Sequence, residues 1–289
     1  MKGKVCLVTG ASSGIGKSVA AGLAAMGAQV VMVSRDADRA ERARQEIIAS
    51  VRNAKVEVVL VDFASQQAVA EAADHFNNKF PRLDVLINNA GAHFSRRHET
   101  TEGVEMTFAI NYLAHFLLTN RLADLLRKSA PCRVINVTGE YHRKGKIHFG
   151  DLNLKNSYSA SKATCQAQLA RVLFTYELAR RTQTTGITAN CVHPGAIATR
   201  ILDNDPDASI FKKLLYKLAM PALDPPEKAA ETILYLASAP ELENVTGRYF
   251  INKSAVRSSE KSYHAELALH LWHVSRQLTS HDHAEPCFV

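Results

Sequence analysis

The sequence lacks long apolar runs and the residue patterns that mark exported or metal-binding proteins. No stretch reaches the roughly 18 apolar residues that a membrane-spanning helix needs. Met1 stands only a few residues before the first strand-like run, so we expect no signal peptide. The five cysteines are odd in number, widely spaced and free of any C-x-x-C pair, which favours reduced thiols and no metal site. These absences predict a cytoplasmic protein that does not bind a membrane.

The charge is positive but shows no concentrated basic segment. The net charge is +7, and the lysines and arginines are scattered along the chain rather than gathered in a run or stripe. Such scattering argues against a nucleic-acid partner. A polyanionic cofactor and ordinary solvated surfaces explain the excess more simply.

Apolar runs rich in β-branched residues alternate with longer segments of helical period along the 289 residues. This alternation predicts an α/β fold with a doubly wound parallel sheet of seven strands, formed by a single domain over residues 1–289. The expected strands are Lys4–Thr9, Gln29–Ser34, Val56–Val61, Leu83–Asn88, Arg133–Thr138, Ile187–Val192 and Arg248–Ile251. The expected helices are Gly14–Met26, Asp38–Val51, Gln66–Lys79, Gly103–Lys128, Thr164–Thr182, Glu227–Ala237 and Ser262–Leu278.

One amphipathic segment, residues 201–223, falls outside this alternation. It follows the carboxyl end of a strand, where open α/β sheets bind ligands. It places Ile210, Phe211, Leu214, Leu215 and Leu218 on one helical face. The segment is either a surface helix packed on the core or a helical lid over a hydrophobic substrate.

A glycine-rich turn joins the first strand to the first helix. Glycines at this spacing allow a tight turn and a close approach to a pyrophosphate, which then lies at the helix N-terminus. Because the motif lies in a strand–turn–helix context, it predicts a Rossmann dinucleotide site. The residues expected to bind there are Gly10, Ser12, Ser13, Gly14, Ile15 and Gly16.

The end of the second strand indicates which nicotinamide cofactor binds. An NAD site places a carboxylate at this position for the ribose 2′-hydroxyl, whereas this strand ends in Ser34 and Arg35. The Arg35 guanidinium can pair with a 2′-phosphate. Asp36 follows, with its side chain expected to point away. The sequence therefore predicts NADP(H).

These motifs, with Asn88-Asn89-Ala90-Gly91, Asn111 and His193-Pro194-Gly195, resemble the short-chain dehydrogenase/reductase family over almost the entire chain. Residues 114–119 and 174–180 look closest to its retinol-dehydrogenase-like and protochlorophyllide-reductase-like branch. The resemblance implies that relatives form dimers or tetramers, so a homo-oligomer is possible. It also implies cofactor contacts to the adenine, the nicotinamide ribose and the carboxamide by Asp62, Phe63, Asn89, Ala90, Gly91, Pro194, Gly195, Ile197 and Thr199.

Catalysis in this family uses a serine, a tyrosine and a lysine. Tyr158 and Lys162 form a formal Y-x-x-x-K match. Members of the family, however, place the lysine roughly 26 residues before the Pro-Gly proline, and that count from Pro194 reaches Gln168. Lys162 would lie six residues, or about 9 Å of helix, too early.

The residues upstream agree with this count. When Arg133–Thr138 is the strand and Asp151-Leu152 the following turn, the tyrosine position falls on Thr164 and the serine position on Gly139. We therefore expect Gly139, Thr164 and Gln168 at the three catalytic positions, with Thr164 and Gln168 still able to hydrogen-bond the ribose and nicotinamide. A local shift that makes Tyr158 and Lys162 catalytic is the alternative.

Other side chains near the strand ends could donate a proton. They are His142, with Tyr141 and Thr138, after the fifth strand and Ser95, with His93, after Asn-Asn-Ala-Gly. A residue in such a position is more often an ordinary loop residue.

Three functional hypotheses follow. The first is an atypical NADPH-dependent ketoreductase for a bulky hydrophobic or aromatic carbonyl, perhaps a polyketide, whose substrate supplies the proton. The second is a non-catalytic NADP(H)-binding protein for sensing or assembly. The third is a conventional retinol-dehydrogenase-like enzyme that uses Tyr158 and Lys162.

Overall fold

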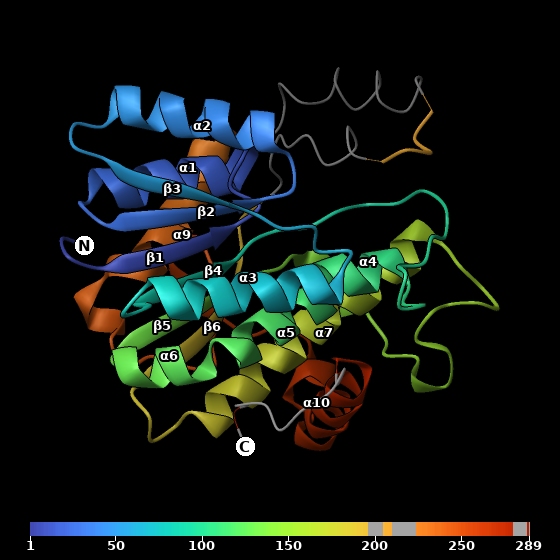
Figure 1. Ribbon diagram of the computed structural model, residues 1–289. Coiled ribbons are helices and arrows are strands. Elements are labelled where there is room, and N and C mark those ends of the chain that lie inside the picture. The colour runs from blue at the N-terminus through green and yellow to red at the C-terminus, as the bar shows by residue number, and fades with distance from the viewer. Residues whose placement is uncertain (196–204, 210–223, 280–287, 289) are drawn as a thin grey trace.

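The computed structural model describes residues 1–195, 205–209, 224–279 and 288. Its centre is an eight-stranded sheet in the order β3-β2-β1-β4-β5-β6-β7-β8 (Figure 1). The strands are β1 (Val5–Thr9), β2 (Gln29–Ser34), β3 (Lys55–Leu60), β4 (Val85–Asn88), β5 (Cys132–Val137), β6 (Ile187–His193), β7 (Tyr249–Ile251) and β8 (Ser254–Val256).

Helices cover both faces of this sheet (Figure 1). Their bounds are α1 (Gly14–Ala25), α2 (Ala37–Ser50), α3 (Gln66–Lys79), α4 (Met106–Phe108), α5 (Ala114–Arg121), α6 (Ala123–Ser129), α7 (Ala160–Arg181), α9 (Pro226–Ser238) and α10 (Ala265–Thr279). A π-helical turn (Ala109–Leu113) joins α4 to α5, and short 3-10 helices lie at Glu140–Lys144, Phe149–Asp151, Pro240–Leu242 and Glu260–Tyr263.

Two apolar cores hold these layers together, one on each face of the sheet. Val19, Ile47 and Ile233 bring α1, α2 and α9 onto one face. The larger core on the other face packs α3, α5 and α7, and it takes in Trp272 of α10, which is 1% exposed. β1 is buried at every position because both of its faces are covered, which explains its continuous apolar sequence.

The parallel doubly wound fold was correctly predicted, with three differences in detail. An eighth strand, β8, pairs antiparallel with β7 at the edge of the sheet. The single helix expected over Gly103–Lys128 is divided at the π-helical turn and again at Leu122. Neither interruption contains Gly or Pro, the residues that usually mark a helix break.

The strand order places the site. The chain runs outward from β1 to β3 and then crosses to β4 on the other side of β1, so β1 and β4 meet at a topological switch point. Open α/β sheets bind ligands at the carboxyl ends of such strands.

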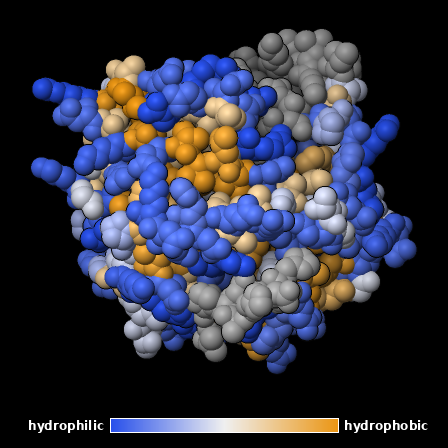
Figure 2. Space-filling model, in the orientation of Figure 1, coloured by the Kyte–Doolittle hydropathy of each residue, from blue (hydrophilic) through white to orange (hydrophobic). Residues whose placement is uncertain are grey.

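The surface in the same view is mainly hydrophilic, with hydrophobic residues exposed in the region of the edge strand β3 (Figure 2). Leu60 at the end of β3 is 54% exposed. In the described part of the chain, no helix combines the length and apolar character that a bilayer crossing requires.

Candidate functional site: a dinucleotide groove and an altered acid position

The glycine-rich turn between β1 and α1 forms the first wall of the site. Gly10 has φ +66°, and a Cβ there would come within 2.9 Å of the Ala90 Cα. A side chain at Gly10 is therefore excluded by both its backbone conformation and the adjacent turn. The close contact brings the turn after β4 against the turn after β1.

Hydrogen bonds fix these two turns together. The Thr9 Oγ1 accepts the backbone N–H groups of Asn89 and Ala90, each at 2.9 Å. The Asn89 side chain donates back to the Thr9 carbonyl at 2.8 Å. Thr9 is fully buried. Its hydrogen bonds therefore hold the two turns that line the groove in a fixed position relative to each other.

The end of β2 supplies the polar part of the groove. The Ser34 Oγ accepts the Asp36 N–H at 3.3 Å, and Arg35 beside it is exposed. Asp36 is also among the residues that line the groove. Its carboxylate caps α2 by accepting the Arg39 N–H at 2.9 Å and pairs with the Arg39 guanidinium at 3.0 Å. The capping N–H lowers the pKa of Asp36.

A single groove runs along these elements at the carboxyl ends of β1, β2 and β4. Most of the predicted cofactor residues line it: Gly10, Ser12, Ser13, Gly14, Ile15, Gly16, Ser34, Arg35, Asp62, Phe63, Asn89, Ala90 and Gly91. Pro194 and Gly195 are described but do not line it, and Ile197 and Thr199 lie outside the described residues. The expected lid, 201–223, also lies almost wholly outside them, with only residues 205–209 described.

Sequence reasoning missed several residues of this groove. Arg39 lines it beside Arg35, one helical turn into α2. The signal was available, because an Asp-x-x-Arg spacing at a helix start places the arginine next to the end of β2. Apolar side chains of Phe94, Ile110 and Val137 also line the groove.

The groove fits a dinucleotide on an observation independent of the motif. The N-cap of α1, Ser13, makes no side-chain capping bond, so it caps none of the first N–H groups of this twelve-residue helix. Ser13 and the first three residues of the helix line the groove. Such an N-terminus binds a phosphate through its N–H groups and the helix dipole. Ser12 to Gly16 would hold the pyrophosphate and Arg35 with Arg39 the adenosine end.

Gly139 lies two residues beyond Val137, the last residue of β5, and Gln168 of α7 packs against it. A Cβ on Gly139 would come within 2.9 Å of the Gln168 Oε1, so the amide fills the space that a side chain at 139 would need. Thr164 lies one turn earlier on the same face of α7. The Thr164 Oγ1 and the Gln168 Oε1 are buried and have no hydrogen-bond partner among the described residues. Buried polar atoms normally have a hydrogen-bond partner, so these two atoms fit a ligand that supplies hydroxyl or amide groups.

The π-helical turn carries Asn111, which faces the loop after β4. Its side chain accepts the Ala92 N–H at 2.7 Å and donates to the Ala92 carbonyl at 2.9 Å. π-Helical turns are frequent at functional sites. Here the turn fixes the backbone immediately after Gly91, which lines the groove.

Three of the other candidate proton donors have structural partners. His142 is fully buried; it lies 2.7 Å from the Gly139 carbonyl through Nδ1, and its Nε2 accepts the Ser259 N–H at 3.1 Å. Both ring nitrogens are thus engaged within the protein, which favours a structural role for His142, and burial lowers its pKa. The Ser95 Oγ donates to the Asp205 carboxylate at 2.6 Å, and the Thr138 Oγ1 donates to the Gln168 carbonyl at 3.3 Å.

Tyr158 and Lys162 are not among the residues that line the groove, and neither are Gly139, Thr164 and Gln168, so the hydrogen-bond partners must distinguish the two sets. The Tyr158 hydroxyl donates to the Phe94 carbonyl at 2.7 Å, and burial raises its pKa to about 12. The Lys162 Nζ instead contacts the Ser157 Oγ at 2.6 Å. A lysine that lowers the pKa of a neighbouring tyrosine must approach it, and no hydrogen bond between these two side chains is seen.

A buried arginine that sequence reasoning missed lies behind this end of the groove. The Arg171 guanidinium donates to the carbonyls of Val137 and Ala90 and to the His115 Nδ1, the last two at 2.9 and 2.8 Å. Arg171 is 6% exposed. Burial lowers its pKa to about 9, which leaves it charged at neutral pH. Burial, with the nearby Arg171 charge, also places the pKa of His115 well below its usual value, so this imidazole is neutral.

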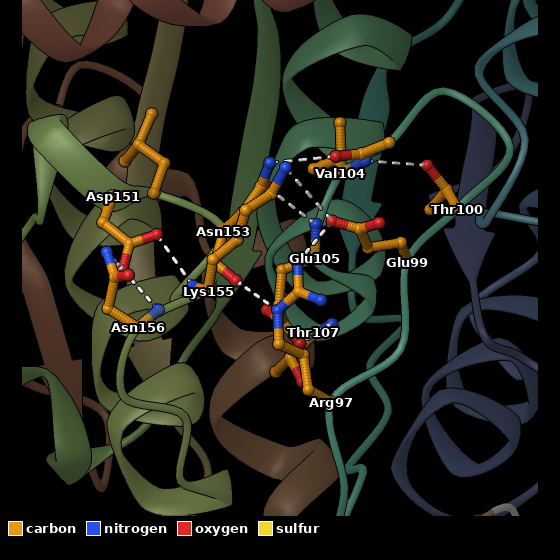
Figure 3. Close-up of polar contacts among 12 residues, drawn as sticks. Arg97, Glu99, Thr100, Val104, Glu105, Thr107, Asp151, Asn153, Lys155 and Asn156 are labelled. Carbon is orange, nitrogen blue, oxygen red and sulfur yellow. Dashed lines mark hydrogen bonds and ion pairs between the residues drawn. The ribbon is translucent and has the colours of Figure 1, made fainter.

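Two loops beyond the strand ends are tied together beside the site (Figure 3). The Asn153 side chain accepts the Glu105 N–H and donates to the Gly103 carbonyl, each at 2.9 Å. The Arg97 guanidinium donates to the Asn153 carbonyl at 2.8 Å. The loop that follows Gly91 is thereby held against the loop that precedes α7.

Comparisons with known proteins agree with this geometry. The family model for short chain dehydrogenase matches residues 4–209. Retinol dehydrogenase 14 of Homo sapiens is 38% identical over 288 residues, which cover 95% of this chain and 86% of the relative. Retinol dehydrogenase 12 of Mus musculus is 39% identical over 276 residues, with 96% and 86% covered. A crystal structure of an uncharacterised protein from Mycobacterium paratuberculosis has a TM-score of 0.76 at 30% identity and covers 96% of this chain and 94% of its own.

Proposed function

Because the chain belongs to the short-chain dehydrogenase family of oxidoreductases, we propose that it is an NADPH-dependent ketoreductase with non-standard catalytic residues. Its proposed substrate is a bulky hydrophobic or aromatic carbonyl compound, such as a polyketide, that supplies its own proton. One observation carries this proposal: Gly139, Thr164 and Gln168, where the family resemblance expects serine, tyrosine and lysine, hold no ionisable group. Gln168 packs against Gly139 just beyond Val137, which lines the groove.

The preference for NADPH over NADH rests on the end of β2. Arg35 and Arg39 both line the groove there, whereas the one carboxylate in this stretch, Asp36, caps α2 and pairs with Arg39. A 2′-phosphate would meet two guanidinium groups. A ribose 2′-hydroxyl would lack the free carboxylate that an NAD site offers.

The chemistry can proceed without the family's acid. The bound cofactor supplies a hydride to the carbonyl carbon, and the oxygen must then gain a proton. A general acid contributes typically 10²–10⁴ in rate, whereas proximity and orientation supply about 7–11 kcal/mol. A phenol next to the carbonyl can give that proton, and the resulting phenoxide regains one from water.

The chain's own residues would orient this reaction. The Thr164 hydroxyl can donate a hydrogen bond to the substrate oxygen, and the Gln168 Oε1 can accept one from a cofactor ribose hydroxyl, which would satisfy both orphan atoms. Phe94, Ile110 and Val137 give that end of the groove an apolar lining. The relatives named for retinol also support a bulky hydrophobic substrate.

The test measures NADPH oxidation with three carbonyl compounds: an aryl ketone that carries an adjacent phenol, its methylated analogue, and retinal. We expect turnover of the phenol, a loss of most activity with the methyl ether, and binding of both. We also expect single replacements of Ser95, Thr138, His142 and Thr164 to cost less than the 10²–10⁴ of an essential acid.

Each contrary result selects another function. Turnover of retinal alone, lost on Tyr158→Phe, would establish a conventional retinol-dehydrogenase-like enzyme. A variant among the four that is inactive yet binds NADPH normally would identify that residue as the acid. NADPH binding without turnover of any carbonyl would favour a non-catalytic NADP(H)-binding protein, which the intact groove beside an altered acid position would also suit.

A further inference from the structure

We propose that Arg171 is a buried cation behind the nicotinamide end of the groove that makes the protein bind the reduced cofactor more tightly than the oxidised one. The inference rests on the proposed function in one respect, namely that a nicotinamide cofactor occupies this groove. It goes further by assigning which form of the cofactor, reduced or oxidised, occupies the groove when both are present.

The positive charge of Arg171 is not neutralised by any hydrogen-bond partner that the described chain provides. Its partners are the carbonyls of Val137 and Ala90 and the imidazole of His115, and none of these is a carboxylate. Its Nε is buried and has no partner among the described residues. A buried arginine usually pairs with an acid, because an isolated charge is costly to desolvate. A buried arginine that has no carboxylate partner indicates that its positive charge has a function.

The hydrogen bonds of His115 hold this charge in place. Its Nδ1 accepts from Arg171, so its Nε2 carries the hydrogen and donates to the Thr9 Oγ1 at 3.1 Å. Thr9 in turn holds the backbone of Asn89 and Ala90. The guanidinium is therefore connected rigidly to the glycine-rich turn and to the turn after β4.

The location puts the charge directly behind the groove wall. Ala90 and Val137, whose carbonyls accept from Arg171, both line the groove. Arg171 lies three residues after Gln168 on the same face of α7. Position 168, where the family resemblance expects a lysine, is neutral here, so the buried cation stands about one helical turn further along.

The effect on the cofactor follows from its charge. The oxidised nicotinamide ring is positive and the reduced ring is neutral, so a nearby cation raises the free energy of the oxidised form alone. For two charges within about 10 Å at an effective dielectric constant of about 20, this repulsion corresponds to roughly tenfold in affinity. The same cation stabilises negative charge that develops on a carbonyl oxygen as hydride arrives.

The test compares dissociation constants for NADPH and NADP⁺, measured by calorimetry, in the wild type, Arg171→Gln and Arg171→Lys. We expect the wild type to prefer NADPH and Arg171→Gln to lose about tenfold of that preference through tighter NADP⁺ binding. Arg171→Lys keeps the charge and should stay within about threefold of the wild-type ratio. The nicotinamide-free fragment 2′-phospho-ADP-ribose serves as a control and should bind all three proteins equally.

Several outcomes overturn the inference. One is a wild type that binds NADP⁺ more tightly than NADPH, which needs no variant and therefore holds even if Arg171→Gln fails to fold. Another is an unchanged ratio in a folded Arg171→Gln, and a third is an equal shift for the nicotinamide-free fragment. Failure of the wild type to bind either cofactor would instead contradict the proposed function.

Discussion

The two ends of the groove are built from different kinds of group. The adenosine and pyrophosphate end is lined by glycines and the start of α1, with Arg35 and Arg39 beside them, and the sequence there keeps the family pattern from Thr9 to Gly16. At the other end the chemistry belongs to side chains, and Gly139, Thr164 and Gln168 carry none of the expected ones. A fold built in this way can keep the residues of a cofactor groove while the residues at its acid position change.

The largest effect is expected from a substitution in the glycine-rich turn, at the pyrophosphate end of the groove. In Gly16→Ala the new Cβ would overlap the Gly10 carbonyl and lie 2.6 Å from the Asn89 Nδ2. We expect at least a hundredfold loss of NADPH affinity, because the glycine-rich turn must move. The measurement is a calorimetric titration.

A matched control lies on the same helix. In Gly22→Ala the Cβ would meet only the flexible end of the Leu234 side chain. This variant should lose stability while binding NADPH normally. Equal binding losses in the two variants would show that Gly16→Ala acts through folding instead of the groove.

The next effect separates the two cofactors. Arg35→Ala should weaken NADPH by about 1.5–3 kcal/mol, the range for a hydrogen bond to a charged group, and leave NADH unchanged. Arg39→Ala should act in the same direction, because Arg39 also lines the groove. Dissociation constants for both cofactors provide the check, and equal affinity in the wild type would contradict the NADP assignment.

Features that depend on a local sequence pattern could be predicted, whereas contacts between side chains that are distant in the sequence could not. The strand–turn–helix at Gly10 and the basic end of β2 are local patterns, so groove and fold were predictable. The partners of His142 were not, because Ser259 comes from a segment 117 residues away. Arg171 was missed for the same reason, since its partners Ala90 and His115 are joined to it only by the fold.

At the side-chain end, Gly139 and Gln168 should behave as one unit. Gly139→Ser places a Cβ within 2.9 Å of the Gln168 Oε1, so we expect a loss of about 1–3 kcal/mol in the free energy of unfolding. Gln168→Ala should relieve most of that cost in the double variant. Urea unfolding of the single and double variants measures the coupling, and Gly150→Ser is the control because nothing lies within 4 Å of its Cβ. Additive effects would mean that the two side chains do not share this space.

A smaller effect concerns pH and His142. Burial lowers the pKa of His142 in the folded state, so the unfolded state binds the proton more readily below pH about 6.5. Stability therefore falls as pH drops from 7.5 towards 5.5, by at most about 1.4 kcal/mol per pH unit for this group. His142→Gln should show a shallower slope in thermal unfolding, whereas the same change at the exposed His264 should not. The slope will not vanish, because burial also lowers the pKa values of His115 and His193.

The smallest expected effect is on catalysis by Tyr158→Phe and Lys162→Ala. Neither residue lines the groove, the Tyr158 hydroxyl is engaged with the Phe94 carbonyl, and Lys162 contacts Ser157. We expect kcat and NADPH affinity within a few fold of wild type, while the lost hydrogen bond at Tyr158 costs about 0.5–1.5 kcal/mol of stability. Steady-state kinetics beside a thermal unfolding curve distinguishes the two effects. Because Phe94 lines the groove, a modest rise in KM without a change in kcat would still agree with this structural role. A hundredfold fall in kcat with the fold intact would make Tyr158 the acid, and the contrast between the two ends of the groove would then be lost.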